Sequence, residues 1–145
     1  MDTLVLHIGP HKTGSTYIQK RLLENRDAFA AMGVVYPDVG IDIQYGHHRI
    51  AELAKHRDAE GLRQILGSVE TAQARCLILS SENFDQLGVD EIGEFKDALP
   101  EAGEVRVIYY VRNPTDMLLS IWQENVKHGA TRSFFEFAEP HISRP

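Results

Sequence analysis

TLVLHIGPHKTGST, residues 3–16, decides the fold of this 145-residue chain. Its first six residues form a short apolar run rich in β-forming residues, and Gly9 and Pro10 end that run abruptly, as expected of a buried parallel strand. Ser15 or Thr16 can then cap a helix whose apolar residues recur at 3.6-residue spacing. A strand, a glycine-containing loop and a helix therefore open the chain.

The alternation of strands and helices continues along the sequence. We expect the first helix to end at Gly33. Further strands are predicted at Val34–Tyr36, Cys76–Leu79 and Val105–Val111, and further helices at about 48–56, 59–74, 90–99, 114–128 and 133–138. This order is typical of an α/β protein, so we predict three layers, α/β/α, around a mostly parallel central sheet, in one domain over residues 1–145.

Composition excludes several classes of protein. The chain is 43% hydrophobic and 25% charged, as in ordinary globular domains, and its formal net charge of −6 disfavours nucleic acid as a partner. The single cysteine, Cys76, permits no intrachain disulfide. There is no apolar run of about 18 residues and no signal-peptide pattern, so we expect no membrane span and a cytoplasmic protein.

The loop GPHKTGST, residues 9–16, has the composition of a phosphate-binding loop. Gly9 and Gly14 are separated by four residues, and two hydroxyl residues follow at the start of the helix. Such glycines let backbone N–H groups converge, and the helix N-terminus adds unsatisfied donors. Ser15 stands where a nucleotide triphosphatase loop carries lysine, and Lys12 lies inside the loop instead. We predict an anion site here; the alternative is a ligand-free turn.

A second candidate anion site follows the strand at residues 105–111. Arg112 would emerge at the carboxyl edge of the sheet, and Ser120 lies eight positions later, two turns inside a helix that Asn113 and Pro114 can start. The guanidinium and the hydroxyl can converge on one phosphate. Two anion sites at the same end of one sheet would suit a nucleotide with phosphates on two positions.

These motifs resemble the sulfotransferases that use 3′-phosphoadenosine 5′-phosphosulfate (PAPS). The family's donor-binding loop is similar to HIGPHKTGST, its 3′-phosphate motif to YYVRNPTDMLLS, and the strand-end motif of its bacterial and carbohydrate-type members to LILSSENF. The resemblance implies a fold like that of P-loop nucleotide hydrolases. It places Lys12 at the bridging oxygen, Ser15 and Thr16 at the 5′-phosphate, and Arg112 and Ser120 at the 3′-phosphate. The donor-binding residues expected are Gly9, His11, Lys12, Thr13, Gly14, Ser15, Thr16, Arg112 and Ser120.

Sulfuryl transfer from PAPS, with 3′-phosphoadenosine 5′-phosphate (PAP) as the product, requires positioning and charge stabilisation. Lys12 can offset charge on the leaving phosphate, and we expect no metal. The acceptor needs a general base, for which Glu82 is the first candidate, and the resemblance supports a glutamate there. Family members that use a histidine make His47 and His48 reserve candidates, of which His48 is preferred. Two histidines that merely cap a helix are the alternative.

Three functions stay open. The first is a PAPS-dependent sulfotransferase that acts on a hydroxyl or amine of a small-molecule or carbohydrate acceptor. The second is a P-loop kinase or nucleotide-binding protein in which Glu82 positions a Mg²⁺-bound water, and the third is a non-catalytic PAP- or PAPS-binding module. Resembling proteins are longer and carry a Gly-rich basic loop after the second motif, so we expect a short or truncated member, in which a homodimer partner can supply the missing wall.

Overall fold

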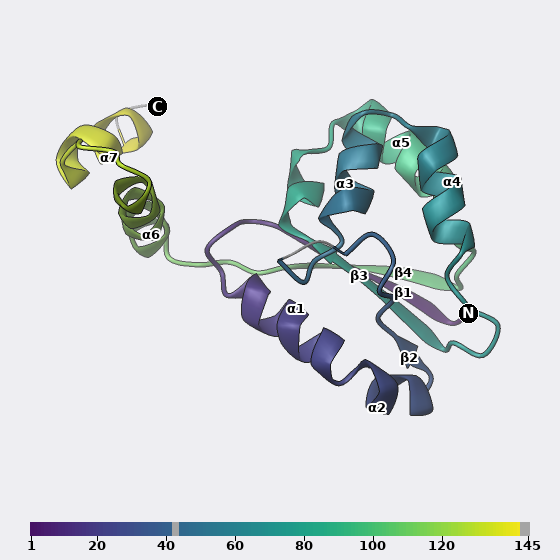
Figure 1. Ribbon diagram of the computed structural model, residues 1–145. Coiled ribbons are helices and arrows are strands. Elements are labelled where there is room, and N and C mark those ends of the chain that lie inside the picture. Colours follow the sequence, from purple (N-terminus) through teal and green to yellow (C-terminus); the bar gives the residue numbers. More distant parts are fainter. Residues whose placement is uncertain (42–43, 143–145) are drawn as a thin grey trace. The chain divides into compact units, whose positions relative to one another are not determined.

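The computed structural model describes residues 1–41 and 44–142. Packing divides the chain into two compact units, Met1–Tyr110 and Val111–Pro145 (Figure 1). The loop at residues 9–16 and Glu82 belong to the first unit, whereas Arg112 and Ser120 belong to the second. The single domain expected over residues 1–145 stays a prediction.

The first unit contains a four-stranded parallel sheet, as expected. Its strands are β1 (Thr3–Ile8), β2 (Val34–Val35), β3 (Cys76–Ser81) and β4 (Glu104–Tyr109), in the order β2-β3-β1-β4. Ile8 at the end of β1 is paired with Ser81 of β3 and with Tyr109 of β4. The loops that leave β1 and β3 therefore start level with one another at the carboxyl edge of the sheet.

Helices lie on both sides of this sheet (Figure 1). On one side are α1 (Ser15–Glu24) and α2 (Arg26–Ala31); on the other are α3 (His48–Lys55), α4 (Ala59–Gly67) and α5 (Val89–Ala98). A short 3₁₀ helix, η1 (Glu82–Gln86), follows β3 directly. The arrangement is consistent with the predicted three layers of an α/β/α fold.

Two predicted helices are shorter than their periodicity indicated. The helix expected to run to Gly33 is interrupted at Asn25, whose side-chain amide donates to the carbonyl of Arg21 at 2.7 Å and whose backbone is not helical. The helix expected over 59–74 ends at Gly67, after which the Ser68 hydroxyl donates to the carbonyl of Ile65 at 2.7 Å. In both places a short polar side chain hydrogen-bonds to a backbone carbonyl of the turn before it, an interaction that favours the end of a helix over its continuation.

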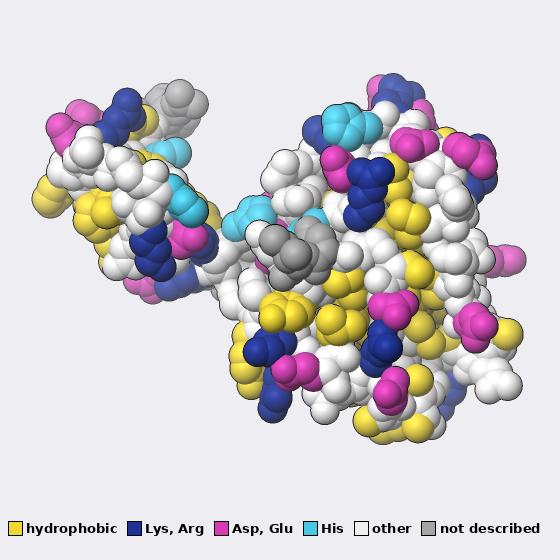
Figure 2. Space-filling view, viewed as in Figure 1, with side chains coloured by type: hydrophobic (Ala, Val, Ile, Leu, Met, Phe, Trp, Pro, Cys, Tyr) yellow, Lys and Arg dark blue, Asp and Glu magenta, His cyan; other side chains and the backbone are white. Residues whose placement is uncertain are grey.

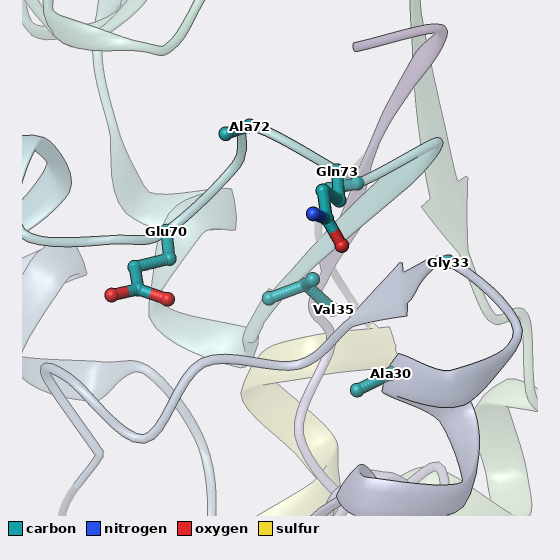
Figure 3. A pocket seen from close by; sticks show the side chains of 7 residues that line it. Ala30, Gly33, Val35, Glu70, Ala72 and Gln73 are labelled. Atoms are coloured by element: carbon teal, nitrogen blue, oxygen red, sulfur yellow. The ribbon is translucent and has the colours of Figure 1, made fainter.

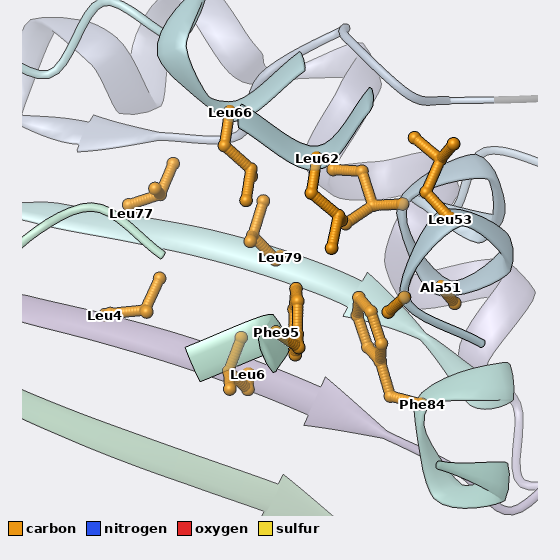
Figure 4. Packing of buried hydrophobic residues seen from close by; sticks show 12 residues of the cluster. Leu4, Leu6, Ala51, Leu53, Leu62, Leu66, Leu77, Leu79, Phe84 and Phe95 are labelled. Atoms are coloured by element: carbon orange, nitrogen blue, oxygen red, sulfur yellow. The ribbon is translucent and has the colours of Figure 1, made fainter. Parts of the chain in front are cut away.

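The apolar core lies between the sheet and α3, α4 and α5 (Figure 4). Leu4 and Leu6 of β1 and Leu77 and Leu79 of β3 point into it. Because side chains alternate along a strand, the neighbouring residues of β1 and β3 face the layer that contains α1. This alternation buries polar residues of two strands beside α1.

The second unit consists of α6 (Pro114–Lys127) and α7 (Phe134–Ile142). Asn113 caps α6, since its side chain accepts from the Thr115 amide at 2.9 Å, and Pro114 is the first helical residue, as predicted. The Trp122 indole donates to the Arg132 carbonyl at 2.8 Å. In the described part of the chain, no helix is long and apolar enough to cross a membrane.

Candidate functional site

The loop between β1 and α1 is held by its own side chains and by η1. The Thr13 hydroxyl donates to the Pro10 carbonyl at 2.9 Å, and His11 Nε2 lies 3.1 Å from Asn83 Oδ1. Lys12 has a left-handed backbone, with φ of 68°, a conformation that costs a residue with a side chain free energy. This unfavourable backbone conformation lies at Lys12, the residue that the sequence predicts to bind the reacting end of the sulfuryl donor.

The first turn of α1 has backbone amides that no side chain caps. Gly14, with φ of 87°, precedes the helix, no side chain caps it, and there is no acidic residue in the first turn. The first amides of a helix lack intrahelical acceptors and carry the positive end of its dipole. Thr16 is exposed here, whereas Ser15 is buried, so the two hydroxyls that the sequence predicts at the phosphate have different surroundings.

Glu82, at the end of β3, is a buried carboxylate, with 4% of the residue exposed. The Ser15 hydroxyl donates to its Oε1, and the Gln19 side-chain amide donates to its Oε2 at 3.1 Å. Burial raises the pKa of Glu82, but the hydrogen bonds from Ser15, from the Glu82 amide and from Gln19, together with nearby His48, outweigh it and lower the pKa. The carboxylate is therefore ionised at neutral pH and tied to the first helical residue after the loop.

His48 joins Glu82 from the first turn of α3. Its Nε2 lies 3.7 Å from Glu82 Oε2, and its Nδ1 lies 2.8 Å from the Ser81 hydroxyl. Ser81 already accepts from the Asn83 amide at 3.2 Å, so its own proton can go to Nδ1, which leaves an N–H on Nε2 facing Glu82. The predicted reserve base thus lies beside the first candidate.

Gly46 lets the chain pass close to this pair. A Cβ on Gly46 would come within 2.8 Å of both His48 Nε2 and Gln19 Nε2, closer than real Cβ atoms approach other atoms. A glycine is needed here because of the space and not because of the backbone angle. Because residue 46 has no side chain, the segment before α3 can pass close to His48 and Gln19, the two residues beside the Glu82 carboxylate.

His47 has a different role from His48. It is fully buried; its Nδ1 accepts from the Ser80 amide at 3.0 Å and its Nε2 donates to the Pro37 carbonyl at 3.0 Å. Burial lowers the pKa of His47 to about 4, so the ring is neutral and both nitrogens are satisfied. The hydrogen bonds of His47 join three segments of the backbone, whereas the ring of His48 faces the Glu82 carboxylate, and this difference distinguishes the two reserve histidines.

Sequence reasoning missed a polar layer underneath Glu82. His7 Nδ1 lies 2.7 Å from the Ser80 hydroxyl, and the Gln19 amide that binds Glu82 also donates to Ser80 at 3.1 Å. In the described part of the chain, three buried side-chain atoms have no hydrogen-bond partner: His7 Nε2, Gln19 Oε1 and His48 Nε2. All three residues lie in the polar layer or beside Glu82. Unpaired buried polar atoms cost free energy and gather at functional sites. The signal available in the sequence was a histidine inside the apolar run of residues 3–8.

The structure brings together most of the predicted site residues. Lys12, Ser15, Glu82 and His48 lie in the first unit, at the ends of β1 and β3 and the starts of α1 and α3. Ser120 lies on α6, two turns after Arg112, as expected. Because these two residues belong to the second unit, their sharing of one nucleotide with the loop stays a prediction.

A cavity of about 330 Å³ lies elsewhere in the first unit and is not this site. It is lined by Ala30, Gly33, Val35, Glu70, Ala72, Gln73 and Ala74 (Figure 3). These residues lie near the amino ends of β2 and β3, opposite the edge where Glu82 follows β3. Among the described residues, no group of three or more His, Cys, Asp or Glu side chains is placed to hold a metal ion.

A comparison with protein-family models, curated proteins and solved structures finds no match to this chain.

Proposed function

We propose that this protein is a sulfotransferase that moves a sulfuryl group from PAPS to a hydroxyl or amine of a small-molecule or carbohydrate acceptor. One observation carries the proposal: the buried Glu82 carboxylate is hydrogen-bonded to Ser15, the first residue of the helix that follows the lysine-containing loop. A buried base and an open helix N-terminus thus share one edge of the sheet. Transfer of a sulfuryl group from a phosphosulfate to a hydroxyl or amine uses a base for the proton of the acceptor and positive groups for the leaving phosphate.

The residues present fit the phosphosulfate end of such a donor. The first turn of α1 has no side-chain cap and no acid, and Lys12 stands in the loop before it. Acidic and basic side chains are interspersed over the surface of the first unit in Figure 2, so attraction of an anion has to be local. Lys12 and the loop amides provide this local attraction for the phosphosulfate, and Arg112 and Ser120 bind the 3′-phosphate.

When bound, PAPS supplies a sulfuryl group whose sulfur–oxygen bond to the 5′-phosphate breaks as a new bond forms to the acceptor. Lys12 and the first amides of α1 offset the negative charge that grows on the leaving phosphate. Glu82 takes the proton of the acceptor hydroxyl or amine. His48, whose Nε2 faces the same carboxylate, orients it and is the second candidate for the base. The buried position of both groups keeps them away from bulk water.

Nucleotide binding separates this function from the kinase alternative. The experiment is a thermal-shift series with PAP, ADP and ATP, each with Mg²⁺ and with a chelator. We expect PAP to stabilise the protein in chelator; a ligand at 100 times its Kd adds about 2.7 kcal/mol. Stabilisation by ATP with Mg²⁺ alone would instead support the kinase.

Transfer activity separates an enzyme from a PAP-binding module. With PAPS and a panel of hydroxyl and amine acceptors, Lys12→Ala and Glu82→Gln should lose transfer, while Glu82→Gln keeps PAP binding. Lys20→Ala is the matched control, because Lys20 carries the same charge on the exposed face of α1. Binding of PAP without transfer to any acceptor by the parent protein would favour the binding module.

A further inference from the structure

The Ser15 hydroxyl has one proton and two expected partners. The proposed function places Ser15 at the 5′-phosphate of the donor, but in the structure its hydroxyl donates to Glu82 Oε1. Ser15 is the first residue of α1, so its backbone amide belongs to the uncapped first turn of that helix. The residue is only 3% exposed, and its side chain reaches the proposed base, Glu82. A hydroxyl donates to one strong acceptor at a time.

The other groups around Glu82 do not share this position. Gln19, a turn further along α1, donates to Oε2, and His48 of α3 approaches the same oxygen. His7 of β1 and Tyr36 are further away and interact with the carboxylate electrostatically. Loss of the Ser15 hydrogen bond would therefore take that side-chain donor from Oε1, while Gln19 and His48 stay at Oε2 and the Glu82 amide keeps its own hydrogen bond to the carboxylate.

We propose that Ser15 couples the two halves of the site: a phosphate in the loop draws the Ser15 hydroxyl away from Glu82 Oε1, and the carboxylate, with one hydrogen-bond donor fewer, becomes a stronger base. The inference rests on the proposed function. It makes Ser15 a positioning residue for Glu82 in addition to a donor-binding one, and it orders the reaction, because deprotonation of the acceptor then waits for the donor.

The electrostatics support this coupling. Burial raises the pKa of Glu82, and the hydrogen bond from Ser15 is the largest of the effects that outweigh burial. Removal of that bond should raise the pKa towards the range in which a carboxylate accepts a proton efficiently. A phosphate also raises the pKa by its own charge, so the test has to separate the two effects.

The test follows the Glu82 carboxyl carbon by NMR during pH titrations, with and without PAP, in protein labelled at the glutamate side chains. Glu82→Gln assigns the signal, and the amides of the loop report occupancy. In the parent protein, PAP should raise the pKa of Glu82. In Ser15→Ala the pKa should already be higher without ligand, and PAP should raise it by less, since only the phosphate's charge remains.

Gln19→Met is the matched control. Gln19 also donates to Glu82, but from outside the loop, so its loss should raise the pKa of Glu82 equally with and without PAP. The rise on adding PAP should then match that of the parent. If Ser15→Ala no longer binds PAP, its ligand-free pKa is compared with that of the parent, and equality overturns the proposal.

The outcomes distinguish the coupling from the proposed function. Loop amides that respond to PAP, with a pKa rise no larger in the parent than in Ser15→Ala, overturn the coupling and leave the sulfotransferase standing. Loop amides that respond to neither PAP nor inorganic phosphate overturn both. A rise in the parent that Ser15→Ala reduces and Gln19→Met preserves supports the coupling.

Discussion

Lys12 combines an unfavourable backbone conformation with the charge that the proposed reaction needs. Its φ of 68° favours glycine, so Lys12→Gly should change the free energy of unfolding by no more than about 1 kcal/mol, because relief of strain offsets the flexibility gained by the unfolded chain. Transfer should fall by about 10²-fold or more, as on loss of one charge-stabilising donor. Urea denaturation and transfer kinetics measure the two quantities; a large loss of stability would show that Lys12 is structural.

His47 predicts how stability depends on pH. Burial lowers its pKa to about 4 from an ordinary 6.5, so the fold favours the neutral ring and the unfolded chain binds the proton more readily. This stabilisation is complete above pH 6.5 and is lost as the pH falls towards 4; for such a shift it amounts to about 3 kcal/mol. His7, whose pKa burial also lowers, acts in the same direction.

Urea denaturation between pH 4.5 and 8 tests this prediction with His47→Gln. The glutamine cannot titrate, so the loss of stability below pH 6.5 should be shallower than in the parent. At pH 8 the variant should be less stable by about 1 to 3 kcal/mol, because the Ser80 amide loses its acceptor. Parallel curves for parent and variant would contradict the neutral, buried histidine.

Two glycines in different segments allow a matched comparison of packing. In Gly46→Ala the new methyl group would collide with His48 and Gln19, so we expect a loss of about 1 to 3 kcal/mol and a larger loss of transfer. In Gly93→Ala, inside α5, the methyl meets nothing within 4 Å, so the helix should gain about 0.5 to 1 kcal/mol. Equal effects of the two changes on transfer would show that space at residue 46 does not matter to the site.

The elements show which parts of the site a sequence can predict. The apolar runs of β1, β3 and β4 and the Asn113–Pro114 start of α6 were predictable because their signals are local. The same holds for the placement of Glu82 near the loop, since both follow neighbouring parallel strands. His7, Gln19 and Ser80 were missed because their meeting depends on the register of β1 against β3 and on the face of α1 turned to the sheet.

His47 and His48 illustrate the same limit. They are adjacent in the sequence, and nothing local distinguishes a ring that joins backbone segments from a ring that faces a carboxylate. The difference arises from the loop before α3, which returns to the end of β3 and brings His47 to Ser80 and His48 to Ser81. The two hydrogen bonds, each between residues 33 positions apart in the sequence, therefore decide which histidine lies beside Glu82.

A chain with a net charge of −6 binds a multiply charged nucleotide only if positive groups are gathered where the ligand lies. The predicted groups are divided between the two units: Lys12 and the loop in the first, Arg112 and Ser120 in the second. The proposed donor carries its 5′ and 3′ phosphates on opposite sides of the ribose. Each group of residues is therefore expected to recognise a different phosphate.

Nucleotides that differ by one phosphate test this division in the intact protein. Arg112→Ala should weaken PAP binding by about 10- to 100-fold, the effect of losing a charge-assisted hydrogen bond, and leave AMP binding unchanged, because AMP lacks the 3′-phosphate. Lys12→Ala should weaken both ligands. Arg132→Ala, which removes the same charge from the second unit, is the control for net charge. Calorimetric titration measures the affinities; equal losses for PAP and AMP in Arg112→Ala would mean that Arg112 does not read the 3′-phosphate and that the nucleotide is held by the first unit alone.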